Sequence, residues 1–90
     1  MAEYRVLCWQ DIPSVIKVAG EDGAELSRQL PDAFQQAIDA EAMRQGLVGS
    51  DEYLEQWTWS DRQERPGSPD RVLDELTEEF ERQLADRRGA

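Results

Sequence analysis

The first residues of the chain carry apolar side chains on both faces of a two-residue period, which predicts a strand over residues 3–10. Tyr4 and Val6 share one face, and Leu7 and Trp9 share the other. A pattern of this kind is typical of a strand that lies centrally in a sheet or is covered on both faces.

Two further strands are predicted over residues 14–19 and 24–30. The segment Asp11-Ile12-Pro13 predicts a turn before the first of them, since proline supplies no ladder donor. Gly20-Glu21-Asp22-Gly23 suits the hairpin loop that joins them. In the second strand Arg28 shares a face with two leucines, so it lies at the rim of the sheet or pairs with a carboxylate. The rim is the favoured alternative.

Helical spacing predicts a helix over residues 32–45. Asp32 is expected to cap it with Gln35 as capping-box partner, and Gly46 is expected to end it. Ser50 is expected to cap a short segment over 51–56. The apolar stripe of the first helix consists of Phe34, Ala37, Ile38 and Ala42.

Trp57 and Trp59 are two residues apart, which is a strand spacing, and predict a short strand over 57–63. Ser68 and Pro69 then start a long helix, as a serine cap followed by proline at the first helical position. Its tail is expected to fray from about residue 87. The apolar stripe of this helix consists of Val72, Leu73, Leu76, Phe80 and Leu84.

Together these elements predict one α+β domain over residues 1–90, in the order β-β-β-α-(short α)-β-α. A mainly antiparallel sheet of three to four strands packs against two helices. No apolar run approaches the length that spans a bilayer, and no signal-type leader opens the chain, so we expect a cytoplasmic protein without a membrane partner.

Twenty acidic against ten basic residues give a net charge of -10, which disfavours nucleic acid as a ligand. An acidic chain can instead imitate DNA and occupy a DNA-binding protein. The carboxylates here are spread along the chain rather than gathered in a dense stripe, so this is the weaker hypothesis.

The chain has one cysteine and no histidine, which excludes a disulfide within the chain, a Cys/His zinc cluster and an imidazole-activated nucleophile. Cys8 is expected to pack as a small apolar residue, with a reactive thiol as the alternative. No residue is singled out for catalysis, cofactor binding or metal binding, and an enzyme is not expected.

Three tryptophans in 90 residues are a dense set, and tryptophan is enriched at interface hot spots. Core packing is the favoured alternative for Trp9, whereas core and surface remain equally open for Trp57 and Trp59. The candidate interaction surface consists of Trp9, Asp11, Ile12, Pro13, Tyr53, Trp57 and Trp59.

Several short blocks of sequence occur together in this chain. They are Trp9-Gln10-Asp11-Ile12-Pro13-Ser14, Leu30-Pro31-Asp32, Phe34-Gln35, Ala37-Ile38-Asp39-Ala40, Gly49-Ser50-Asp51-Glu52-Tyr53-Leu54 and Glu64-Arg65-Pro66-Gly67-Ser68. As a set they resemble a small bacterial family labelled "virulence factor", which also occurs as a module in larger proteins, among them a staphylococcal conserved virulence factor with helical repeats. The label describes a phenotype, and the family carries no agreed site residues.

Stand-alone members of this family are encoded near corrinoid and folate methyl-transfer genes, so the resemblance implies an accessory role in a one-carbon methyltransferase system. The leading hypothesis is a non-enzymatic accessory or interaction domain with an unidentified protein partner; self-association stays open. The alternative is a small auxiliary enzyme or small-molecule-binding protein of one-carbon metabolism that uses Asp11, Arg28 and Glu64.

Overall fold

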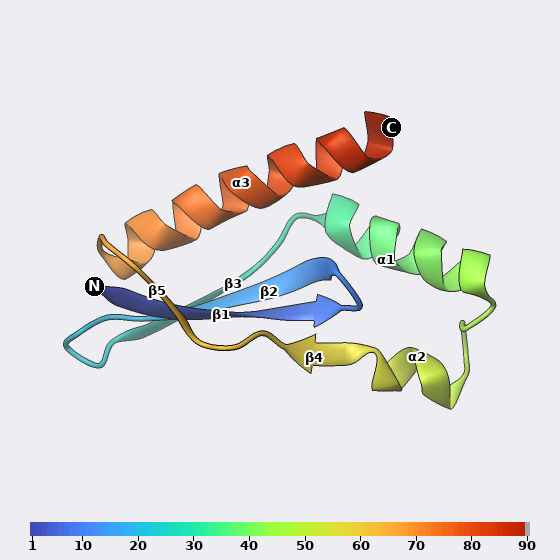
Figure 1. Cartoon of the computed structure of the whole chain (residues 1–90), viewed down its shortest axis with the longest axis horizontal. Coiled ribbons are helices and arrows are strands. Elements are labelled where there is room, and N and C mark those ends of the chain that lie inside the picture. Colours follow the sequence, from blue (N-terminus) through green and yellow to red (C-terminus); the bar gives the residue numbers. More distant parts are fainter. Residues whose placement is uncertain (90) are drawn as a thin grey trace.

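The computed structural model describes residues 1–89 and arranges them in two layers, with helices over one face of a sheet (Figure 1). The elements in chain order are β1 (Ala2–Trp9), β2 (Ile12–Ala19), β3 (Glu25–Gln29), α1 (Asp32–Gln45), α2 (Asp51–Glu55), β4 (Trp57–Trp59), β5 (Gln63–Arg65) and α3 (Pro69–Gly89). This architecture confirms the predicted α+β class and element order, with one more strand than expected.

The sheet is antiparallel and has β1 and β2 at its centre, with β3 on the outer edge of β2. The other edge of β1 is shared, because β4 pairs with one half of it and β5 with the other half. In Figure 1, α3 lies along the sheet and α1 lies near one end of it.

The predicted strand over 57–63 is wrong in its middle, because residues 60–62 separate β4 from β5. The Ser60 backbone N–H donates to the Val6 carbonyl at 2.8 Å, as in a ladder. The Val6 N–H, however, donates to the Ser60 hydroxyl at 2.9 Å rather than to a backbone carbonyl. A side-chain oxygen thus takes a place in the ladder, which is why the strand is interrupted here.

The turn after β1 is shorter than expected, since Pro13 lies inside β2 rather than before it. The register between β1 and β2 shifts beside Leu7 and Cys8: Leu7 faces Val15, whereas Cys8 faces Pro13. Ser14 is therefore an additional residue at a bulge. An irregularity of this kind is one of the places where a strand accommodates a proline.

Three of the expected helix caps are confirmed. Gly46 adopts the left-handed conformation, with φ of 72°, after the last turn of α1. The Ser50 hydroxyl accepts the Tyr53 N–H at 3.4 Å, and the Ser68 hydroxyl accepts the Arg71 N–H at 3.4 Å. These local signals fixed the helix ends as predicted.

The expected cap by Asp32 is wrong. Pro31 occupies the cap position without a side-chain hydrogen bond, and Asp32 is already the first helical residue. Its carboxylate lies in the first turn, where negative charge favours the helix dipole. Gln35, expected as the capping-box partner, instead donates to Asp39 one turn later at 3.0 Å.

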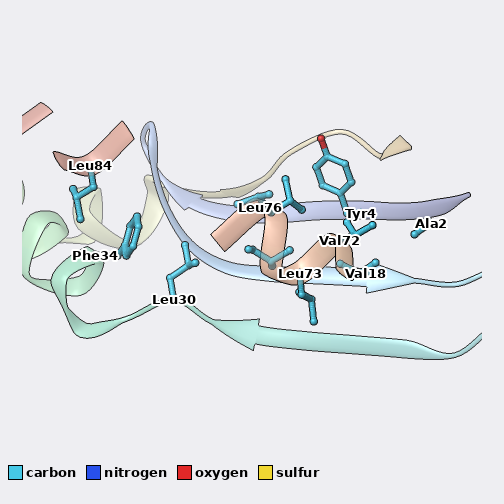
Figure 2. Close-up of a cluster of buried hydrophobic side chains, with 11 residues drawn as sticks. Ala2, Tyr4, Val18, Leu30, Phe34, Val72, Leu73, Leu76 and Leu84 are labelled. Carbon is cyan, nitrogen blue, oxygen red and sulfur yellow. The ribbon is translucent and has the colours of Figure 1, made fainter. Parts of the chain in front are cut away.

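The main core lies between the sheet and α3, where side chains from β1, β2, α1 and α3 meet (Figure 2). Both predicted helical stripes are packed in this core or in the second cluster at the end of the sheet. Their buried members are Phe34, Ile38, Ala42, Val72, Leu73, Leu76 and Leu84.

Both sequence-based alternatives for Arg28 are met. It lies on β3 at the rim of the sheet, and its guanidinium donates to the Asp74 carboxylate of α3 at 2.8 Å and to the Thr77 hydroxyl at 3.3 Å. The arginine stem thereby covers the rim of the core, and its charge is neutralised by the helix.

The helix α3 continues through Arg87 to Gly89, and fraying of the tail from about residue 87 stays a prediction. The Arg87 guanidinium donates to the Asp11 carboxylate at 3.2 Å, which ties the last turns of α3 to the turn after β1. Ala90 lies outside the described residues.

We predict a pH-dependent contribution from the ion pair between Arg65 of β5 and Glu79 of α3, whose second hydrogen bond measures 3.0 Å. Hydrogen bonding to Arg65 holds the pKa of Glu79 below its ordinary value of 4.5, so the stabilisation is present above that pH and lost as the pH falls below it. Glu79→Gln should lower the free energy of unfolding by about 0.5 kcal/mol near neutrality.

Urea unfolding at about pH 7 and about pH 3 checks this pH dependence. Glu78→Gln is the matched control, because the Glu78 carboxylate forms no ion pair among residues 1–89. An equal loss of stability for Glu79→Gln at both pH values would show that the ion pair contributes nothing.

Candidate interaction surface

Three rows of side chains cross the sheet face that points away from α3, and we call this the open face. The strand register defines the rows, because residues paired across antiparallel strands lie side by side on the same face. The acidic row is Glu64, Glu3, Ala19 and Glu25; the cationic row is Arg5, Lys17 and Ser27; the apolar row is Trp59, Leu7, Val15 and Gln29. Every residue in these rows is exposed or half-buried.

Trp59 is the most prominent side chain of the open face, with 37% of its surface exposed. Its ring reaches from the apolar row over the cationic row: the Arg5 guanidinium carbon and the Lys17 ammonium nitrogen each lie 5.3 Å from the ring centroid. The sequence left the environment of Trp59 open, and the structure places it on the surface.

A shallow hollow of about 270 Å³ lies over the cationic and acidic rows. Arg5, Lys17 and Arg62 contribute its positive charge, and Glu3 and Glu25 contribute its negative charge. Sequence reasoning did not select Arg5 or Lys17, because their proximity depends on the register of two strands. Two-residue alternation along each strand was the only signal in the sequence that could have placed Arg5 and Lys17 on the same face.

Three aromatic residues of the candidate interaction surface are exposed or half-buried and follow one another in space. We call them the aromatic series: Tyr53, Trp57 and Trp59. Trp57 precedes Trp59 by two residues in β4 and so lies on the same side of that strand. Tyr53 of α2 packs edge-on against Trp57, with ring centroids 6.3 Å apart. Beyond Tyr53, a hollow of about 350 Å³ is also lined by Met43 and Val48, both largely exposed.

Trp9 and Ile12 are core residues, so neither belongs to the accessible part of the candidate interaction surface; for Trp9, the favoured alternative of core packing is confirmed. Trp9 is 0% and Ile12 2% exposed, and both pack against Ile38 of α1. The Trp9 indole N–H donates to the Tyr53 carbonyl at 2.9 Å, and the two rings lie 5.6 Å apart. The register places Trp9 beside Trp57, so the aromatic series borders this buried cluster.

Two residues around the turn after β1, Asp11 and Pro13, lie beside α3. Asp11 is exposed and pairs with Arg87, while Pro13 is half-buried. Both line a small hollow of about 50 Å³ together with Phe80 and Leu84. The predicted surface is thus divided, with Asp11 and Pro13 away from Trp59.

The residues of the alternative small-molecule or catalytic site do not converge. Asp11 pairs with α3 at the end of the sheet, and Arg28 faces α3 from the β3 edge. Glu64 lies on the opposite edge, in the acidic row of the open face. Within residues 1–89, no group of three or more acidic or cysteine side chains is arranged to hold a metal ion.

Cys8 packs against the main core and is half-buried, in line with the expected apolar role. Burial raises the pKa of its thiol, and the nearby charge of Asp11 raises it further.

We predict that iodoacetamide at about pH 8 alkylates Cys8 well below the rate of free cysteine, and that unfolding in urea restores the free rate. Mass spectrometry over time checks this; equal rates in the folded and unfolded chain would contradict it.

The positions of the tryptophans predict losses of stability of very different size. Trp9→Ala should cost about 3–5 kcal/mol, because it opens a cavity and leaves the Tyr53 carbonyl without its donor. Trp59→Ala should cost less than about 1 kcal/mol, since it removes an exposed ring and two weak cation–π contacts. Urea denaturation followed by circular dichroism measures both, and similar losses for the two variants would contradict this assignment.

Among the described residues, no helix is both long and apolar enough to cross a membrane. The chain matches no curated protein and no solved structure. The sequence profile described as "Virulence factor" matches residues 7–88, which run from the last three residues of β1 to the end of α3 but for Gly89. Because this match covers nearly the whole chain, the protein belongs to the Virulence factor family.

Proposed function

We propose that this chain is a non-enzymatic protein-interaction domain that docks a partner on its open face, with Trp59 at the centre of the contact. The observation that carries the proposal is an exposed tryptophan on the part of the open face whose rows stay exposed or half-buried, away from the end where α1 packs with Trp9 and Ile12. Tryptophan contributes a large area at low entropic cost and is the residue type most enriched at binding hot spots.

The surroundings of Trp59 fit the anatomy of a docking surface. Leu7 and Val15 stand beside it in the apolar row and are half-buried, so they still offer apolar surface to a partner. The charged rows lie to one side as a polar rim. Apolar centres with polar rims are characteristic of protein interfaces.

A narrower form of the proposal concerns the identity of the partner. The family resemblance implies an accessory role in a corrinoid or folate methyltransferase system, and a component of such a system is the partner that we propose to test first. This narrower form rests on the resemblance alone, whereas the docking surface rests on the geometry around Trp59.

A photo-crosslinking experiment in the source cells tests the docking surface. A benzoylphenylalanine at Ser27, exposed in the cationic row, should yield one discrete crosslinked protein, and Trp59→Ala in the same chain should abolish that product. The matched control places the same group at Glu78, exposed on α3, from which this product should be absent.

The captured protein, once purified, should bind the domain in calorimetry, and Trp59→Ala should weaken this binding about tenfold or more. Crosslinks that persist in Trp59→Ala, or that form equally from Glu78, would place the contact elsewhere and overturn the proposal.

A further inference from the structure

Arg5 of β1 and Lys17 of β2 lie directly opposite each other on the open face, as a cross-strand pair of like charge. Like charges in directly opposed positions destabilise a sheet. Neither side chain forms an ion pair among the described residues, whereas five arginines elsewhere in the chain do. The sheet therefore keeps two adjacent, unneutralised cations at its centre.

The chain is not short of carboxylates that could neutralise this pair. It carries twenty acidic residues against ten basic ones, and the acidic row runs beside the cationic row on the same face. Successive rows are two residues, or about 6.6 Å, apart along the strands. Among the described residues, no ion pair joins Glu3 or Glu25 to the two cations, although all four line the same hollow. The contacts of both cations with the Trp59 ring offset only part of their repulsion.

Resting on the proposed function, we infer that the open face binds an acidic polypeptide segment of the partner. An Asp or Glu carboxylate of that segment lies between Arg5 and Lys17, and an apolar side chain beside it packs on Trp59. This arrangement removes the repulsion between the two cations when the partner binds. Arg62, which lines the same hollow, adds a third positive charge.

The pattern of the rows favours an acidic segment over other anions. A cationic row next to an apolar row matches a polypeptide whose acidic and apolar side chains are about 6.6 Å apart, the spacing of alternate residues in an extended chain. The glutamates of the acidic row oppose the successive phosphates of a nucleic acid, whereas a polypeptide segment can place a single carboxylate over the cationic row.

Lys17 is the only lysine of the chain, which allows a site-specific probe. Reductive methylation with ¹³C-formaldehyde labels Lys17 and the terminal amino group of Met1 and preserves both charges. A synthetic peptide with the repeat Leu-Thr-Glu-Thr should shift the Lys17 methyl signal and the Trp59 indole N–H signal in a saturable manner. The Met1 signal serves as an internal control and should stay in place.

The matched ligands are the same peptide with glutamine in place of glutamate, inorganic phosphate, and adenosine monophosphate. None of these should shift the two signals at the peptide's saturating concentration. A shift caused by phosphate or the nucleotide but not by the acidic peptide would overturn the inference. So would a Lys17 signal that moves only with the concentration of the domain itself, which would indicate a second copy on this face.

Lys17→Glu separates recognition from folding. It replaces the like-charge pair by an attractive pair with Arg5, so the melting temperature should stay the same or rise, while peptide binding followed at Trp59 should fall about tenfold or more. Arg62→Gln should weaken binding less. If Lys17 served only to stabilise the sheet, the melting temperature of Lys17→Glu would fall, and that outcome would overturn the inference.

The two proposals fail in different ways. If the crosslinked partner is lost in Trp59→Ala but binds Lys17→Glu normally, the docking surface stands and the acidic recognition is wrong. If the acidic peptide binds at Lys17 while crosslinks from Ser27 do not depend on Trp59, the anion site stands and the proposed docking of a partner on Trp59 is wrong.

Discussion

Burial of apolar side chains between α3 and one face of the sheet is the interaction on which the rest of the structure depends. Val72, Leu73 and Leu76 of α3 reach the central strands, and α1 adds Phe34 at the end of the layer (Figure 2). The rest of the α1 stripe, Ile38 and Ala42, packs with Trp9 and Ile12 in the second cluster at the end of the sheet. The rows of the open face between Glu3 and Leu7 lie beyond that cluster and stay exposed or half-buried.

Polar side chains shape the edges of this scaffold. The Ser60 hydroxyl replaces a ladder carbonyl beside Val6 and divides the outer strand in two, which leaves Trp57 and Trp59 on a strand of three residues. At the other edge, the ion pair of Arg28 with Asp74 holds β3 against α3. These contacts position the aromatic series and leave the surface in front of it clear.

Charge is distributed in two ways within one small fold. Five of the described arginines pair with carboxylates of the same chain. Three of these pairs join β5, β3 and the turn after β1 to α3. Arg5 and Lys17 instead share a tryptophan ring as their partner. A cation that meets an aromatic face keeps its charge available, because the ring quadrupole does not neutralise it.

The amino-acid sequence by itself determined the helices, their caps at Gly46, Ser50 and Ser68, and the stripes that form the core, because these signals act within a few residues. Local pattern failed at Asp32, Pro13 and Ser60, where conformation depends on a neighbouring strand or on the position of a proline. Only the tertiary structure decided which tryptophans are buried and that Arg5 faces Lys17. Both depend on strand register, and a bulge of one residue is enough to change which side chains share a face.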